Sequence, residues 1–249
     1  MHLKLVISYD GTRFAGWQSQ PGKDAVQDFL ESAFSRVAGD RILVHGSGRT
    51  DAGVHALGQC AHVDVPDKGW EPQAWQRAIN ANLPAEIRIL TATRAPTSFH
   101  ARFSAKGKTY QYLIHRGAIL PPLDLHRVWH VHQKLDLDQL QAAAALFEGE
   151  HDFAAFAANR AEPVRNTRRR IHSIRVQARG DRISLSFTGE GFLYKMVRML
   201  TGAIVRCAIG REPMEDIRHR LKQGGPKWTY VAPACGLYLV RVLYRSPRR

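Results

Sequence analysis

The sequence predicts an α+β protein built from two halves, each with the element order β-α-β-β-α-β. Two observations predict this class. The hydropathy pattern runs through that order twice along the 249 residues, and the 44% hydrophobic and 23% charged composition is typical of globular domains. This order is the ferredoxin-like arrangement. We therefore expect two ferredoxin-like halves, residues 1–105 and 106–249, which join near residues 96–107.

The first half begins with a strand and a helix. Apolar residues alternate over residues 3–9, and the Asp10-Gly11 pair ends the run, as in a strand followed by a turn. Asp24 and Gln27 resemble an N-cap and its capping box, and Gly39 suits the C-terminal end of the helix.

Two strands then flank a glycine-rich loop. A short strand over residues 41–44 leads into the loop, and a strand over residues 59–65 leaves it. Pro72 suits the first position of a second helix, and residues 87–93 form the last strand of this half.

The second half repeats the order with different residues. Residues 108–115 form a strand, and either Asp136 or Asp138 begins a helix that ends at Gly149. A hairpin follows, with strands 171–178 and 182–187 on either side of Gly180-Asp181.

Two helices and a strand complete the second half. Apolar residues keep helical spacing over residues 192–209, and a shorter helix follows Pro213. A strand over residues 236–244 ends the pattern.

The charge balance points to a polyanionic partner. Lys and Arg number 36 against 22 Asp and Glu, which gives a net charge of +14 and a pI near 10.2. Nucleic acid is the leading partner and an acidic membrane surface the second. The densest positive run, residues 159–170, is expected to contact phosphates, and residues 245–249 form a basic tail. Two sheets lying side by side are expected to leave a basic cleft between them.

Cysteine usage and the chain's start predict a cytoplasmic protein. Cys60, Cys207 and Cys235 are odd in number and far apart, which disfavours a disulfide framework or a zinc knuckle. The N-terminal residues lack the apolar core of a signal peptide, and no apolar run approaches membrane-spanning length. We expect no membrane association.

The loop HGSGRTDAGVHALGQ, residues 45–59, combines four glycines with a single acid, Asp51. It lacks the Lys-Ser or Lys-Thr pair of a P-loop and the third glycine of a dinucleotide fingerprint. A metal site would have to use His45, Asp51 and His55 of the loop with His62 and Asp64 of the following strand, but no familiar ligand spacing is present. Two interpretations remain: a hairpin loop in which Asp51 caps its own backbone, or a held nucleophile or base kept ionised beside Arg49.

Six blocks in the same order resemble the tRNA pseudouridine synthase A (TruA) family. GRTDAGVHALGQ is similar to the family's catalytic motif. The other blocks are an opening segment (ISYDGTRFAGWQSQP with AVQDFLESAF), INANLPAEI, FHARFSAKGKTYQYLI, GFLYKMVRMLTGAIV and APACGLYLVRV. Together they span nearly all of the chain.

The resemblance implies an isomerase that converts uridine to pseudouridine at positions 38, 39 and 40 in the anticodon arm of tRNA. It implies a pseudouridine synthase fold with a largely antiparallel central sheet, and neither metal nor organic cofactor. The family's essential aspartate corresponds to Asp51, which would attack either ribose C1′ or uracil C6. The family acts as a homodimer.

The resemblance also assigns four substrate-binding residues. Arg49 would take the space of the flipped base and contact the RNA, although a loop arginine can equally pair with Asp51. Tyr110 would stack on the uracil, and its alternative is core packing on the strand face that it shares with Tyr112. Tyr112 is expected in the core. Arg198 would pair with the catalytic carboxylate, and its alternative is a solvated helix face. Leu237 would line the pocket, and its alternative is strand core.

Two other function classes compete with this interpretation. One is an RNA-binding protein without catalysis on the same scaffold, which would have no use for a carboxylate facing its RNA. The other is a metal-dependent nucleic-acid hydrolase, which the absent ligand spacing disfavours.

Overall fold

The computed structural model describes residues 1–159 and 166–244, which form two compact units. Unit 1 contains Met1–Lys106 and the described residues from Tyr238 onward, and unit 2 contains Gly107–Leu237. The sequence-based division at residues 105 and 106 differs in one element, because the last strand groups with unit 1. That division into two halves otherwise stays a prediction.

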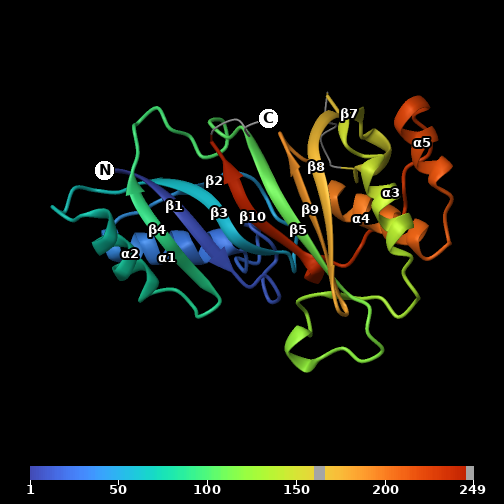
Figure 1. Cartoon of the computed structure of the whole chain (residues 1–249). Helices are drawn as coiled ribbons and strands as arrows, with labels where there is room; N and C mark the ends of the chain where they lie inside the picture. The colour runs from blue at the N-terminus through green and yellow to red at the C-terminus, as the bar shows by residue number, and fades with distance from the viewer. Residues whose placement is uncertain (160–165, 245–249) are drawn as a thin grey trace. The chain divides into compact units, whose positions relative to one another are not determined.

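Unit 1 combines a mixed sheet with two helices (Figure 1). Its elements are β1 (His2–Tyr9), α1 (Val26–Ala38), β2 (Val44–Gly46), β3 (His55–Asp64), α2 (Pro72–Asn80), β4 (Ile87–Arg94) and, after unit 2, β10 (Leu237–Leu243). The strands lie in the order β4-β1-β3-β10, and β2 also pairs with β3. Strand β1 is antiparallel to β3 and β4, and β2 is antiparallel to β3, whereas β10 runs parallel to β3.

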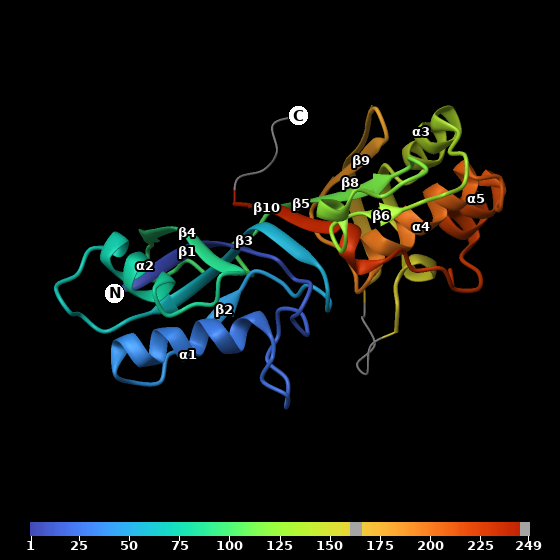
Figure 2. The same cartoon turned by 90° about the horizontal axis from the view of Figure 1, so that it is seen from below.

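The core of unit 1 lies between this sheet and its helices. Alternate residues of β1 are buried, and Phe34 of α1 stacks on Trp75 of α2 with ring centroids 6.4 Å apart. Figure 2 shows α1 lying along one face of the sheet. The other face carries the side chains of His2 and Lys4, which are opposite Asp64 and His62 of β3 in the register.

Unit 2 consists of a mainly antiparallel group of strands with three α-helices. Its elements are β5 (Gly107–His115), β6 (Trp129–His130), α3 (Leu137–Ala145), β7 (Gly149–Asp152), β8 (Arg168–Arg179), β9 (Arg182–Gly189), α4 (Met196–Ala208) and α5 (Met214–Gln223), with short 3₁₀ turns at Pro122–Asp124, Ala154–Phe156 and Ala234–Gly236. The order β5-β9-β8-β7 is antiparallel throughout, and β6 pairs in parallel with β5. Helices α3 and α4 pack together through small and apolar residues such as Ala143, Ala144 and Ala203.

Most of the expected elements are present, with shifted ends. Pro72 is the first residue of α2, and the hairpin turns at Gly180-Asp181. Asp136, rather than Asp138, caps α3, since its carboxylate accepts the N–H groups of Asp138 and Gln139. Strands β6 and β7 were not expected.

Several predicted boundaries are wrong. The strand expected over residues 41–44 lies instead at Val44–Gly46, and helix α3 ends at Ala145 rather than at Gly149. Helix α1 is capped at Ala25, not Asp24, and the Ala25 N–H donates to the Asp28 carboxylate at 3.1 Å. Helix α4 starts at Met196 rather than at residue 192, because Lys195 adopts a left-handed conformation (φ 56°) that no helix continues through. Strand β3 starts at His55 rather than at residue 59, so four residues of the glycine-rich stretch belong to the sheet.

Candidate functional site

Asp51 lies in the connection between β2 and β3, at residues 47–54 of unit 1. Its side chain is half-buried. The Val54 N–H donates to the Asp51 carbonyl at 3.1 Å, and Gly53 has φ +76°. A tight turn with a positive φ at its third position favours glycine, which explains Gly53. The turn fixes the chain direction directly after the carboxylate.

The segment that follows β1 supports the backbone of this loop from the other side. The Trp17 N–H donates to the Thr50 carbonyl at 3.1 Å, and the Gly53 N–H donates to the Phe14 carbonyl at 3.4 Å. Gly16 has φ +93°, and a Cβ built on it would lie 2.5 Å from the Thr50 carbonyl oxygen. The two chain segments are therefore in backbone contact on both sides of Asp51.

Gln59 of β3 fastens the first turn of the loop. It is fully buried. Its Oε1 accepts from the Ser47 hydroxyl at 2.8 Å, and its Nε2 donates to the Gly48 carbonyl at 2.9 Å. Breaking a buried amide network of this kind leaves its members without partners, which costs about 1–3 kcal/mol for each group. The network holds the loop where it leaves β2.

Tyr9 at the end of β1 holds the residue next to Asp51. Its hydroxyl lies 2.8 Å from the Thr50 Oγ1, and both side chains are buried. Burial raises the pKa of Tyr9 far above its ordinary value, so the phenol stays neutral and keeps its hydrogen. Sequence reasoning missed Tyr9, Gln59 and Trp17 as supporting residues, although Tyr9 ends the alternating strand and Gln59 is a polar residue between buried neighbours.

Arg49 lies on the same loop with an exposed side chain. Its Nε donates to the Gln18 Oε1 at 3.1 Å. The guanidinium thus contacts Gln18 of the supporting segment, and the pairing with Asp51 that sequence adjacency suggested stays a prediction.

The other three predicted site residues lie in unit 2. Tyr110 of β5 is 7% exposed, and its ring meets that of Phe192 edge to face with centroids 5.2 Å apart. Leu237 is 6% exposed at the start of β10. Both are as buried as core residues, which was the alternative interpretation for each.

Arg198 of α4 and Tyr112 of β5 hold the segment that leads to Leu237. The Arg198 Nε donates to the Ala232 carbonyl at 2.8 Å, and the Ala232 N–H donates back to the Arg198 carbonyl at 3.1 Å. The Tyr112 hydroxyl donates to the Pro233 carbonyl at 2.7 Å. Arg198 thus has a structural contact rather than a purely solvated position. Tyr112 is fully buried, which confirms its expected place in the core.

The basic run at residues 159–170 is described only in part, since residues 160–165, like the basic tail at 245–249, lie outside the described residues. In the described part, Arg168 and Arg170 both contact Glu150 of β7, at 3.4 and 3.0 Å. Hydrogen bonds from Arg168 and then Arg170 lower the pKa of the Glu150 carboxyl. The phosphate contacts expected of this run stay a prediction.

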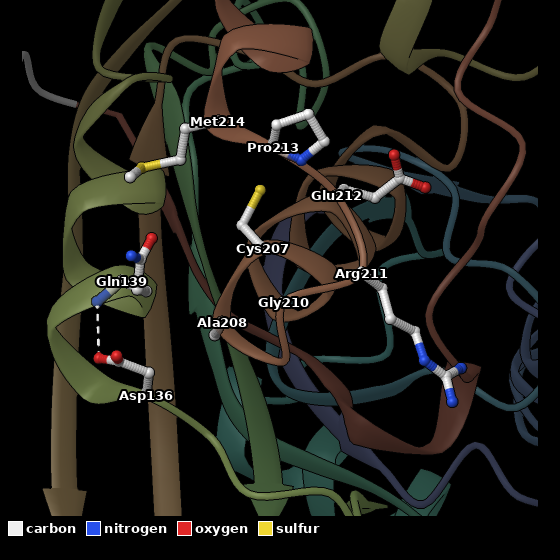
Figure 3. A pocket seen from close by; sticks show the side chains of 9 residues that line it. All are labelled: Asp136, Gln139, Cys207, Ala208, Gly210, Arg211, Glu212, Pro213 and Met214. Atoms are coloured by element: carbon white, nitrogen blue, oxygen red, sulfur yellow. Dashed lines mark hydrogen bonds between the residues drawn. The ribbon is translucent and has the colours of Figure 1, made fainter.

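A hollow of about 590 Å³ lies in unit 2, away from every predicted site residue of that unit (Figure 3). The Cys207 thiol and the Met214 side chain extend toward it from α4 and α5, and Asp136 and Gln139 border it on α3. Burial raises the pKa of Cys207 to about 11, so this thiol is a poor nucleophile at neutral pH.

Neither a metal centre nor a membrane span was found in the part of the chain that the structure describes. No group of three or more His, Cys, Asp or Glu side chains in residues 1–159 and 166–244 could hold a metal ion. Within the same ranges, every helix is too short or too polar to cross a membrane.

Comparisons with known proteins agree on one family. The family model described as tRNA pseudouridine synthase matches residues 5–104 and 143–245. A protein named tRNA pseudouridine synthase A from Akkermansia muciniphila is 46% identical, over 97% of this chain and 94% of its own length. Proteins of the same name from Citrifermentans bemidjiense and Bacillus licheniformis are each 40% identical, over 98% of this chain and 98% and 99% of theirs.

A solved structure gives a much weaker match. A chain from the crystal structure of a Cbf5-Nop10-Gar1 complex aligns with 82% of this chain and 44% of its own, at 13% identity and a TM-score of 0.36. This similarity is too low to carry an argument about the site.

Proposed function

The chain belongs to the tRNA pseudouridine synthase family, and we propose that it isomerises uridine to pseudouridine at positions 38, 39 and 40 in the anticodon arm of tRNA. The family match covers most of both units, and the relatives align with the chain almost from end to end. The net charge of +14 suits a polyanionic substrate. Each unit would supply one ferredoxin-like half of the fold.

Asp51 is the nucleophile of this proposed reaction. The observation that carries the assignment is the contrast between its half-buried carboxylate and the loop around it, whose backbone is held by Tyr9, Trp17 and Gln59. A nucleophile that is kept in place needs no ordering at the moment of attack, which lowers the barrier. The small residues Ala52 and Gly53 beside it leave room for a nucleotide.

The chemistry requires a group that attacks and later leaves. The carboxylate either forms a bond to ribose C1′ as the C1′–N1 bond breaks, or adds to uracil C6, after which the C1′–N1 bond breaks. The uracil then turns and C5 forms a bond to C1′. The carboxylate departs from C1′ or C6, the proton on C5 is lost to solvent, and N1 takes up a proton. The target nucleotide has to leave the base stack to reach Asp51, as in other enzymes that act on bases.

Four further side chains have proposed roles toward the substrate. Arg49, exposed beside Asp51, contacts the RNA and fills the space of the flipped base. Tyr110 stacks on the uracil and Leu237 lines the pocket. Arg198 supports the catalytic carboxylate, in addition to its contact with Ala232.

The proposal also covers the oligomeric state and the cellular location of the protein. We expect a homodimer in which one tRNA touches both subunits, which light scattering would detect as a mass near twice 28.0 kDa. We expect a cytoplasmic enzyme, because its substrate is tRNA and its three cysteines are free thiols.

The substitution Asp51→Asn tests the nucleophile directly. We expect it to abolish tritium release from tRNA that carries uridine tritiated at C5, because the amide cannot attack. The dissociation constant for tRNA should change by less than about threefold, since no phosphate contact is lost. Tritium release at the wild-type rate would refute the assignment.

A further inference from the structure

A rigid turn after β4 presents an exposed aromatic side chain. Phe103 is 75% exposed. The His100 imidazole Nδ1 accepts the backbone N–H groups of Arg102 and Phe103 at 3.2 and 3.3 Å, and the Ser104 N–H donates to the His100 carbonyl at 2.9 Å. The turn is therefore closed by its own hydrogen bonds, and the ring is held out by a fixed backbone.

The turn is anchored to the sheet of unit 1 by stacked histidines. The Ala101 N–H donates to the His62 Nδ1 at 3.1 Å. The ring centroids of His62 and His100 are 4.5 Å apart, and His45 of β2 stacks on His62 at 4.9 Å. His100 lies in turn 4.3 Å from the Phe103 ring. The four rings form a continuous series from the buried sheet surface to the exposed phenylalanine.

His62 and His100 favour the neutral imidazole in this support. Burial, followed by the neighbouring imidazoles, lowers the pKa of His62 to about 4, and burial also lowers the pKa of His100. The nearby carboxylate of Asp64 is paired with His2, with 2.7 Å between Oδ1 and Nδ1. The positive charge near the Phe103 ring therefore comes mainly from neighbouring lysine and arginine side chains.

Those cations lie close to the exposed aromatic surface. The Arg102 guanidinium carbon lies 5.6 Å from the Phe103 ring centroid, and the Lys4 Nζ lies 4.3 Å from the ring of Tyr244, which packs on Phe99. Aromatic rings interleaved with cations are the surface that stacks nucleic-acid bases and contacts their phosphates. The comparably exposed Ile119 and Leu123 in unit 2 are aliphatic and offer no such stacking surface.

We propose that Phe103 and Arg102 form a stacking platform for a nucleotide of the tRNA substrate other than the uridine that is isomerised. Phe103 stacks on the base and Arg102 contacts the adjoining phosphate. The inference rests on the proposed function for the identity of the RNA, but it adds a binding surface separate from the Asp51 loop. A stacking contact of this kind positions the RNA and takes no part in the chemistry.

Binding of an unmodified tRNA transcript to the full chain, measured over a series of salt concentrations, tests the platform. Phe103→Ala should weaken binding by about five- to a hundredfold, the range that loss of one stacked base gives. It should leave the slope of log affinity against log salt unchanged. Arg102→Gln should lower that slope by about 0.7–0.9, the value for one phosphate contact. Phe103→Tyr, which keeps the ring, should bind within about twofold of wild type.

Leu90→Ala is the matched control, because Leu90 is a 49% exposed apolar side chain of β4 in the same unit. It should leave tRNA affinity unchanged. Wild-type affinity in Phe103→Ala, or an equal loss in Leu90→Ala, would overturn the platform. Failure of the proposed function is distinguishable, since the wild-type protein would then release no tritium from a transcript tritiated at uridine C5, whether or not it binds that transcript.

Discussion

One irregular segment carries Asp51 and Arg49, another leads to Leu237, and different kinds of contact hold the two segments. In unit 1, Tyr9, Trp17 and Gln59 form hydrogen bonds to Thr50 and Gly48 of the loop at residues 47–54. None of these bonds uses the Asp51 side chain. In unit 2, the segment at residues 230–237 is fastened by Arg198 itself.

This difference determines what substitutions can reveal. A change at Asp51 removes a functional group, while the contacts that Tyr9, Trp17 and Gln59 make with its loop do not involve that side chain. A change at Arg198 removes a proposed functional group together with a contact that shapes the neighbouring chain. Activity and stability can therefore be tested separately at Asp51, whereas a substitution of Arg198 is expected to change both.

Gly11→Ala is expected to have the largest effect, because it disrupts the close backbone contact between the segment after β1 and the loop at residues 47–54. A Cβ at Gly11 would overlap the Val54 carbonyl, so the two segments have to move apart. We expect a loss of about 3 kcal/mol in unfolding free energy and about a hundredfold in turnover. Gly22→Ala is the matched control, since its Cβ would meet nothing closer than the Asp24 carboxylate at 3.5 Å. Equal stability of the two variants in urea denaturation would contradict the role of close approach at Gly11.

Arg198→Ala should lower stability and activity together. A hydrogen bond from a charged group to a carbonyl contributes about 1.5–3 kcal/mol, so unfolding should shift by that amount. The control is Arg218→Ala, which removes an exposed ion pair with Glu215 and should cost less than about 0.5 kcal/mol. If Arg198→Ala lost tritium release with unchanged stability, the contrast between the two segments would be wrong.

Tyr112→Phe should have the smallest effect of the three. It removes the hydroxyl that donates to the Pro233 carbonyl and keeps the buried ring. We expect a loss of about 1 kcal/mol in thermal unfolding and little change in turnover, because Arg198 still holds the segment. Tyr230→Phe, in the same segment with a 36% exposed ring, serves as the control. A large loss of turnover in Tyr112→Phe with normal stability would instead assign the phenol a role toward the substrate.

The sequence predicted the elements whose signals are local. The alternation in β1, the proline at the start of α2 and the Gly180-Asp181 turn are local features, and each is present. The predicted start of β3 at residue 59 was too late, because a glycine at position 58 is more typical of a loop. In the structure a Cβ there would lie 2.5 Å from the Val240 carbonyl of β10, a contact between strands far apart in sequence. Local pattern carries no information about such contacts.

The candidate site shows the same limit. Asp51 stood out because one acid among glycines is a local anomaly. The groups that hold its loop are the Tyr9 and Gln59 side chains of β1 and β3 and the backbone of the segment after β1, and no local sequence pattern predicts which loop they contact. The contact between Gln18 and the Arg49 guanidinium was not predicted for the same reason, because Gln18 comes from another segment.

Mapping pseudouridine in an unmodified pool of tRNA after incubation with the pure protein tests the central claim most directly. The account predicts new pseudouridine at positions 38, 39 and 40 wherever these are uridine, and none after incubation with Asp51→Asn. Pseudouridine confined to other positions, or the same pattern with Asp51→Asn, would contradict it.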